Sequence, residues 1–205
     1  MTELSGLYAI TDAGLIAPEH FPAAIRAALC GGAKIIQYRD KSNDREQRFH
    51  QATIIQALCK QHGALLIIND DVELARDVDA DGVHIGLDDR PIQDARTILG
   101  RERIIGVSCY NQLTLAEQAA HDGADYIAFG SFFNSPTKPR AVNADVSLLQ
   151  AARRFDVPLC AIGGITLENA SALIDAGADM VAVISAVFGS EDIELTCHQF
   201  KQLFS

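Results

Sequence analysis

Apolar residues along this chain gather in short runs that alternate with amphipathic stretches. Eight of these runs have the length and the aliphatic, β-branched content of strands that are buried on both faces. They span residues 7–11, 34–39, 65–69, 82–86, 104–108, 126–130, 159–164 and 181–185. A helix-like segment follows each run, so the pattern predicts parallel strands that alternate with helices.

A repeated unit joins helix to strand at four places, residues 27–39, 77–86, 118–130 and 173–185. In each, an amphipathic stretch ends in glycine, a small or acidic residue follows, and an apolar run begins. Glycine just past a helix can take the left-handed conformation that ends it. Eight such strand–helix steps, about 15 to 30 residues apart, fit a closed barrel better than an open sheet.

We therefore predict an α/β protein with a (β/α)8 TIM barrel, formed by a single domain over residues 1–205. The alternative is a flavodoxin-like or Rossmann sheet, but no Gly-x-Gly-x-x-Gly motif follows the first apolar run. At 48% hydrophobic and 21% charged residues, a chain of 205 residues can bury a full core as one domain.

Composition narrows the location and the partners. No apolar run approaches the roughly 20 residues that cross a bilayer, and the N-terminus lacks the layout of a signal peptide, so we expect a cytoplasmic protein without a membrane partner. The five cysteines are scattered, which predicts buried, reduced thiols. A net charge of −10 argues against a nucleic-acid partner. A homo-oligomer is compatible with the sequence but is not specified by it.

Chemistry in a TIM barrel sits where strands end and the following loops begin. Polar residues concentrate at these places. Gln37, Arg39 and Lys41 follow one another with a period of two, so their side chains share one face of an extended chain. Arginine and lysine together suit a diphosphate, although they could equally pair with nearby carboxylates on a solvated rim.

Two aspartates follow neighbouring predicted strands. Asp70 and Asp89 could share one hard cation that also contacts phosphate oxygens, and magnesium (Mg2+) fits best because it takes one or two protein carboxylates. The alternative is that Asp70 caps the helix starting near Val72 and that Asp89 caps the helix near Pro91.

Three further features lie at predicted strand ends. Gly163-Gly164 precedes a predicted helix and Ser185 begins another, so backbone N–H groups at both could hold a phosphate. The long loop 131–145 follows the sixth strand and is expected on the active-site face. His84 lies within an apolar strand, where a packed barrel-wall histidine is the more common outcome than a catalytic one.

The ordered motifs resemble the thiamine-phosphate synthase family over essentially the whole chain. They are LYAITD (7–12), QYRDK (37–41), INDD (68–71), DGVHIG (81–86), GVS (106–108), PTK (136–138), AIGGIT (161–166) and AGAD with VISA (176–186). The resemblance implies a transferase of thiamine biosynthesis that acts on phosphorylated small molecules. It would join a pyrimidine diphosphate to a thiazole phosphate, with magnesium, and release diphosphate.

The resemblance also implies residue roles. Catalysis and contact with the diphosphate would fall to Arg39, Lys41, Ser108 and Lys138, with Asn69 and Gln37 also binding this substrate, while Asp70 and Asp89 would hold magnesium. The thiazole phosphate would be bordered by Ser135, Thr137, Gly164, Ile184 and Ser185. Two alternatives stay open: a thiazole tautomerase of the same fold, and a non-catalytic phosphate-binding barrel.

Overall fold

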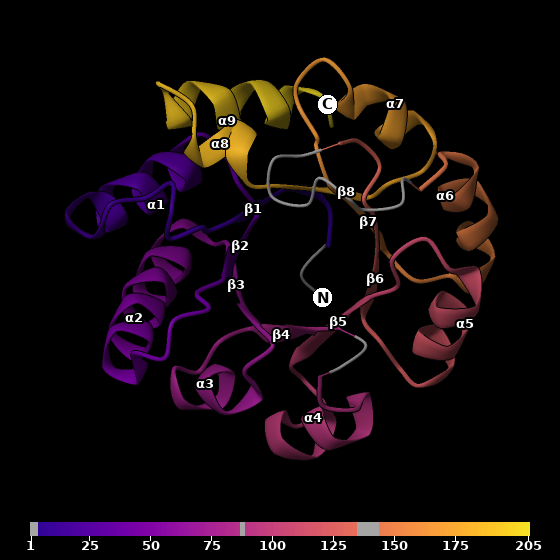
Figure 1. Ribbon diagram of the computed structural model, residues 1–205, viewed down its shortest axis with the longest axis horizontal. Coiled ribbons are helices and arrows are strands. Elements are labelled where there is room, and N and C mark those ends of the chain that lie inside the picture. Colours follow the sequence, from indigo (N-terminus) through magenta and orange to yellow (C-terminus); the bar gives the residue numbers. More distant parts are fainter. Residues whose placement is uncertain (1–3, 87–88, 135–143) are drawn as a thin grey trace.

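The computed structural model describes residues 4–86, 89–134 and 144–205. Eight parallel strands in these ranges close into a barrel, each paired with the next along the chain and β8 paired with β1 (Figure 1). The strands are β1 (Gly6–Ile10), β2 (Ile35–Tyr38), β3 (Leu65–Asn69), β4 (Gly82–Ile85), β5 (Ile104–Ser108), β6 (Tyr126–Phe129), β7 (Leu159–Ile162) and β8 (Met180–Val183). The predicted (β/α)8 TIM barrel is confirmed.

Helices surround the barrel on its outside (Figure 1). They are α1 (Phe21–Cys30), α2 (Arg45–His62), α3 (Val72–Asp77), α4 (Ile92–Leu99), α5 (Leu113–His121), α6 (Ser147–Ala152), α7 (Ala170–Asp175), α8 (Ser185–Phe188) and α9 (Ile193–Gln202), with short 3-10 turns η1 (Pro18–His20) and η2 (Arg153–Phe155). None of the helices in the described ranges is long and apolar enough to cross a membrane.

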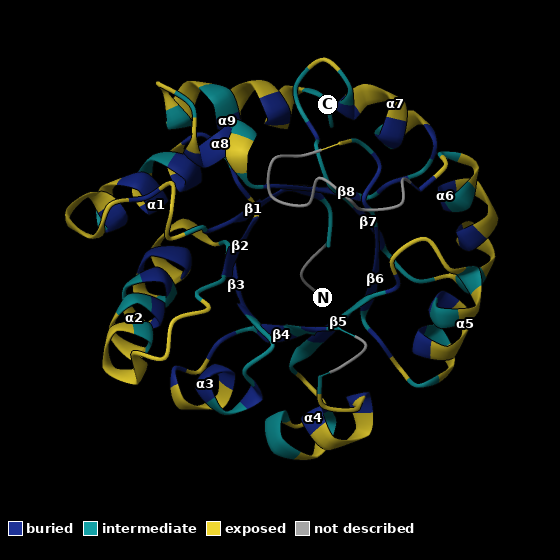
Figure 2. Ribbon diagram, viewed as in Figure 1, coloured by how far each residue is buried: buried dark blue, intermediate teal, exposed yellow. Residues whose placement is uncertain are grey.

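Two apolar cores explain why the strand sequences have no polar face. Alternate strand residues point outward and pack under the helices, whose inner sides are buried and outer sides exposed (Figure 2). The other residues fill the barrel interior, among them Ile35, Ile67 and Met180. Along β2 the inward series continues from Ile35 to Gln37, so the apolar interior gives way to polar side chains toward the strand's C-terminal end.

The repeated unit takes the predicted turn at three of its four places. Gly32, Gly123 and Gly177 adopt left-handed backbone, with φ of 102°, 86° and 107°. The unit at 77–86 differs, because Asp79 takes the left-handed position (φ 55°) and Gly82 opens β4. A Cβ on Gly82 would lie 2.1 Å from the Ile104 carbonyl oxygen, so glycine is needed there for close strand contact and not for the turn.

The acidic residue of the repeat closes the N-terminal end of the barrel. An aspartate precedes each of three strands: Asp81, Asp125 and Asp179. Each carboxylate accepts a backbone N–H from the first or second residue of the neighbouring strand. The bonds are Leu66 N to Asp81 Oδ2 (2.8 Å), Ile105 N to Asp125 Oδ2 (2.7 Å) and Leu159 N to Asp179 Oδ2 (2.8 Å). Fixing these strand starts helps to set the register of the barrel, whose opposite ends carry the chemistry in TIM barrels.

The cysteines depart from expectation at one position. All five are free thiols, and Cys59, Cys109, Cys160 and Cys197 are buried as predicted. Cys30 is exposed instead. It is the last residue of α1, where the outward side of the helix meets solvent.

Candidate active site

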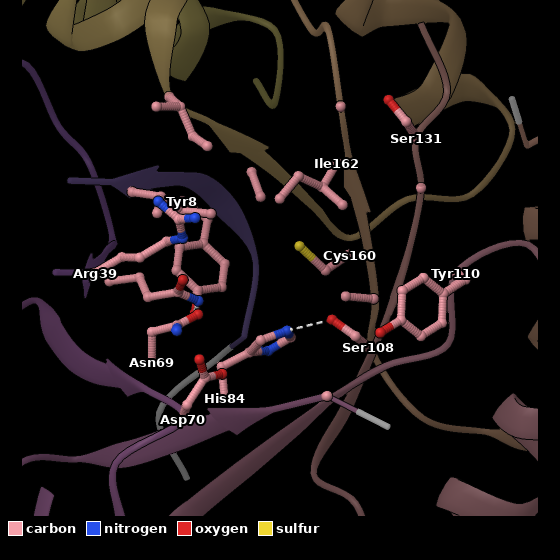
Figure 3. Close-up of a pocket in the computed structure, with 18 of the residues that line it drawn as sticks. Tyr8, Arg39, Asn69, Asp70, His84, Ser108, Tyr110, Ser131, Cys160 and Ile162 are labelled. Atoms are coloured by element: carbon pink, nitrogen blue, oxygen red, sulfur yellow. Dashed lines mark hydrogen bonds between the residues drawn. The ribbon is translucent and has the colours of Figure 1, made fainter. Parts of the chain in front are cut away.

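One cavity of about 740 Å³ opens at the C-terminal end of the barrel. Every strand or the loop after it contributes to its wall (Figure 3). Its size suits small-molecule substrates, and its position is the one where TIM barrels carry out their chemistry. Of the residues singled out from the sequence, the cavity is lined by Gln37, Arg39, Lys41, Asn69, Asp70, His84, Asp89, Ser108, Gly163 and Ile184.

The period-two series that begins in β2 borders this cavity with all three of its residues. Gln37 is buried, at 3% exposure, and its Nε2 donates to the hydroxyl of Tyr8 at 2.8 Å. Arg39 Nη1 lies 3.6 Å from Asp12 Oδ2, so the arginine both borders the cavity and has a carboxylate neighbour. The wide spacing and partial exposure of that pair leave the guanidinium able to bind an anionic ligand.

Neither aspartate of the acidic pair caps a helix. Asp71 caps α3 instead, with its Oδ1 accepting the Leu74 N–H at 2.9 Å, while α4 has Pro91 at its N-cap position and no side-chain cap. Asp70 adopts left-handed backbone (φ 63°) and borders the cavity. Asp89 also borders it and accepts the Gly86 N–H at 2.6 Å. The capping alternatives for Asp70 and Asp89 are therefore wrong.

Electrostatics sets the two carboxylates apart from ordinary surface acids. Burial and, after it, repulsion from the adjacent Asp89 carboxylate together raise the pKa of Asp70 to about 6, against the opposing effect of Lys41. Two carboxylates in contact favour a shared cation. Within residues 4–86, 89–134 and 144–205, no group of three or more His, Cys, Asp or Glu side chains gathers for a metal.

His84 lies in the barrel wall, as expected, and it also faces the cavity. Its Nδ1 lies 2.9 Å from the hydroxyl of Tyr126, and its Nε2 lies 2.8 Å from Ser108 Oγ (Figure 3). Burial lowers the pKa of His84 to about 4. The ring is therefore neutral near pH 7 and is poorly suited to act as a general acid.

The turn after β7 differs from the expected helix start. α7 begins only at Ala170, because Asn169 closes a turn: its Oδ1 accepts the Thr166 N–H at 2.9 Å and its Nδ2 donates to the Gly164 oxygen at 3.0 Å. Gly163 borders the cavity, whereas Gly164 and Ser185 are not among the described residues that line it. Ser185 does open a helix, α8.

The loop after β6 begins and returns beside the cavity. Ser131 borders the cavity, and its backbone oxygen accepts the Ala144 N–H at 2.7 Å. The segment between these two residues therefore starts and ends on the active-site face, where the sequence placed it. Ser135, Thr137 and Lys138, to which the resemblance assigns substrate contacts, lie outside the described residues.

Several cavity residues escaped the sequence reasoning. Tyr110, Asn111 and Gln112 line the mouth, and Tyr8 and Cys160 line the floor. Tyr110 has φ 52°, an unusual backbone for an aromatic residue that no sequence signal announces. Tyr8 could have been found, because a hydroxyl at an inward position of an apolar strand must have a polar partner.

Comparisons with known proteins agree with the geometry. The profile of the family described as thiamine monophosphate synthase matches residues 7–187. Thiamine-phosphate synthases from Acidithiobacillus ferrooxidans and Thioalkalivibrio sulfidiphilus are 52% and 50% identical to this chain, over 98% of it and 95% and 96% of their own lengths.

Solved structures give the same result. Thiamine phosphate pyrophosphorylase from Pyrococcus furiosus superposes with a TM-score of 0.88 at 36% identity, over 98% of this chain and 96% of its own. A 3-hexulose-6-phosphate synthase superposes with a TM-score of 0.70 at 17% identity, over 97% of this chain and 99% of its own, and shares the fold alone.

Proposed function

The chain belongs to the thiamine monophosphate synthase family, and we propose that it joins 4-amino-5-hydroxymethyl-2-methylpyrimidine diphosphate to a thiazole phosphate. The products are thiamine phosphate and diphosphate. Its enzyme class is that of the thiamine-phosphate synthases, transferases of thiamine biosynthesis. The proposal concerns the two substrates, the metal and the order in which bonds change.

One observation carries the proposal. The same cavity has Arg39 and Lys41 on its wall together with the adjacent carboxylates of Asp70 and Asp89. A ligand that carries one phosphate would need only the cations. A diphosphate with a bound divalent cation matches both signs of charge, because its oxygens contact the cations of the protein while the metal contacts the aspartates.

The donor set fits magnesium. Asp70 and Asp89 would hold it, and the raised pKa of Asp70 reflects burial together with repulsion from Asp89, which a divalent cation relieves. When bound, magnesium supplies positive charge to the departing diphosphate. Magnesium commonly takes only one or two protein carboxylates and completes its shell with waters and substrate oxygens, which suits this pair of aspartates.

The protein's own residues position and stabilise the leaving group. The Arg39 guanidinium offers a planar fork to two phosphate oxygens, and Lys41 adds a compact charge beside it. Asn69 and Ser108 border the same space and supply further polar contacts. These charges act where negative charge develops as the carbon–oxygen bond breaks, which is how a preformed site lowers a barrier.

A dissociative reaction suits the rest of the cavity. Burial raises the pKa of the Cys160 thiol, so it is a poor nucleophile, and His84 is neutral at pH 7. Departure of diphosphate leaves a pyrimidine-methyl cation that the ring's amino group stabilises, and the thiazole nitrogen then captures it. Such a route needs positioning and electrostatics but no protein base.

The thiazole phosphate would occupy the side of β7 and β8. Gly163 and Ile184 border the cavity there, and Gly164 and Ser185 are the residues that follow them in the sequence. Ser135 and Thr137 would complete this subsite from the loop after β6. Holding the retained phosphate away from the leaving diphosphate places the thiazole nitrogen next to the reacting carbon.

Incubating the protein with both substrates and magnesium should yield thiamine phosphate and diphosphate in equal amounts. Omitting magnesium or adding a chelator should remove the activity, because the aspartates alone repel the leaving group. Product is measured by chromatography and diphosphate by a coupled assay. Isomerisation of a thiazole without coupling would instead favour the tautomerase and overturn the proposal.

Lys138→Ala should slow diphosphate departure by about a hundredfold, the order found when one group that stabilises transition-state charge is removed. The measurement is the single-turnover rate with enzyme in excess over the pyrimidine substrate. Lys60→Ala is the control, since Lys60 is exposed in the last turn of α2. A single-turnover rate equal to that of the unmodified protein would remove Lys138 from the mechanism.

A further inference from the structure

A row of polar side chains lies inside the barrel, at the floor of the cavity. Gln37 Nε2 lies 2.8 Å from Tyr8 Oη, which lies 2.8 Å from Tyr126 Oη. Tyr126 Oη lies 2.9 Å from His84 Nδ1, and His84 Nε2 lies 2.8 Å from Ser108 Oγ. Five residues from five strands thus form one continuous hydrogen-bonded chain that ends at the cavity wall.

The chain has a single direction. An amide nitrogen only donates, so Tyr8 accepts from Gln37 and gives its own hydrogen to Tyr126. Tyr126 then gives its hydrogen to Nδ1 of His84. The neutral imidazole carries its proton on Nε2 and donates it to Ser108. The reverse direction would make Tyr8 accept from both Gln37 and Tyr126, which would leave its own buried hydrogen without an acceptor among the described residues.

Burial stabilises this direction of hydrogen bonding, from Gln37 to Ser108. Tyr8 and Tyr126 are 1% and 0% exposed, so water cannot replace a missing partner. Burial also raises the pKa of both phenols well above its ordinary value, so each keeps its hydrogen. The Tyr126 ring stacks on His84 with centroids 5.6 Å apart and crosses Tyr8 edge to face at 6.0 Å.

The sequence makes room for this arrangement at Gly106. A Cβ there would lie 1.9 Å from Cζ of Tyr126 and 2.4 Å from its hydroxyl. Glycine on β5 therefore lets the Tyr126 ring occupy the barrel axis beside His84. Ser108 lies two residues further along the same strand, and its hydroxyl oxygen accepts the hydrogen bond from His84 Nε2. Its own hydrogen is then free to point into the cavity.

We propose that Tyr8 and Tyr126 are positioning residues that fix the Nε2–H tautomer of His84 and so make Ser108 a hydrogen-bond donor to the substrate. This inference rests on the proposed function only in taking Ser108 to face the diphosphate substrate. The Ser108 hydroxyl would donate to an oxygen of the leaving group. A serine whose hydrogen was taken up by His84 would instead present a lone pair to that negative charge.

The tautomer can be tested without substrate, by nitrogen-15 NMR of histidine side chains in the intact protein. We expect His84 to carry its proton on Nε2 with Nδ1 hydrogen-bonded. Tyr126→Phe keeps the stacked ring but removes the hydroxyl, so the Nδ1 signal should move away from its hydrogen-bonded position. Tyr38→Phe is the matched control, because Tyr38 is an equally buried tyrosine whose hydroxyl bonds Gln51 outside the barrel.

A proton on Nδ1 in the unmodified protein would overturn the proposal, as would an unchanged Nδ1 signal in Tyr126→Phe. The second arm is kinetic. Tyr126→Phe should lower the single-turnover rate by up to about tenfold, the effect of losing one well-placed hydrogen bond. The same substitution in a Ser108→Ala background should have almost no further effect on the rate. Tyr126 is proposed to act on the substrate through the Ser108 hydroxyl, which that background lacks.

An equal rate loss in both backgrounds would show that Tyr126 acts by some other route and would overturn the positioning role. Failure of the proposed function would look different. The unmodified protein would then form no thiamine phosphate, while the histidine spectra would still report the tautomer and its dependence on Tyr126.

Discussion

Asp70→Asn should give a protein that is more stable than the unmodified chain and at least about a hundredfold less active. The activity falls because one of the two carboxylates proposed to hold magnesium becomes neutral. The stability rises because the folded state partly buries the Asp70 carboxylate and holds it against Asp89, and both penalties are absent in the unfolded chain. Asparagine tolerates the left-handed backbone that Asp70 adopts, so the fold is kept.

The sign of the pH dependence follows from the raised pKa. Folding raises the pKa of Asp70 from 3.8 to about 6, so between these values the folded state binds the proton that the unfolded state releases. Stability therefore falls as pH rises through this window, and the full penalty is present above about pH 6. The advantage of Asp70→Asn should be largest at pH 7 to 8 and should vanish near pH 4.

Thermal unfolding at several pH values measures this effect. Because the Asp70 carboxyl is partly exposed and screened by water, we expect a gain of roughly 1 kcal/mol, or about 2–4 °C in Tm for a chain of this size. Magnesium should raise the Tm of the unmodified protein and not that of Asp70→Asn, because a ligand stabilises only the state that binds it.

Asp79→Asn is the matched control for Asp70→Asn. Asp79 also has left-handed backbone, with φ 55°, but its carboxylate is exposed and pairs with Arg103 away from the cavity. It should keep full activity and lose at most about 0.5 kcal/mol of stability. If Asp70→Asn proved as active as Asp79→Asn, the metal role of Asp70 would be wrong.

The contrast between Asp70 and Asp71 shows where sequence reasoning ends. The apolar runs predicted all eight strands, because a strand buried on both faces has no polar alternation and is easily recognised. Which of two adjacent aspartates caps α3 depends on where the helix starts, and a shift of one residue exchanges their roles. Only the three-dimensional backbone assigns the cap to Asp71 and leaves Asp70 to the cavity.

The barrel floor shows a second limit. The sequence placed Gln37, His84 and Ser108 at strand ends, yet nothing in it indicated that Tyr8 and Tyr126 join them in one chain of hydrogen bonds. Those contacts link residues up to 118 positions apart, and they depend on the stagger of the strands around the barrel. Local patterns identify inward-facing residues but not which of them meet across the barrel axis.

Gly164→Ala should strongly destabilise the protein at the active-site end of the barrel. Gly164 has φ 64°, and a Cβ there would lie 2.6 Å from the Asn134 oxygen and 2.7 Å from the Phe133 oxygen. Both obstacles are backbone atoms, so no side chain can rotate away. The segment is held in place, since Phe133 N donates to the Gly163 oxygen at 3.0 Å.

Gly63→Ala separates the two causes of the stability lost in Gly164→Ala, which are the left-handed backbone and the clash of the added Cβ. Gly63 has nearly the same backbone, with φ 66°, but nothing lies within 4 Å of its added Cβ. It should lose only the left-handed penalty of about 1 kcal/mol, whereas Gly164→Ala should lose roughly 3 kcal/mol because overpacking adds to that penalty. Urea unfolding of both variants measures the difference.

The same pair tests the proposed thiazole subsite. Relief of the clash at Gly164 must push the start of the loop after β6 away from β7, which would separate the two sides of that subsite. Gly164→Ala should therefore raise the KM for the thiazole phosphate more than that for the pyrimidine diphosphate, and Gly63→Ala should change neither. Equal loss of stability in the two variants would mean that the backbone clash is absent. Equal KM changes for both substrates would mean that Gly164 does not border the thiazole phosphate.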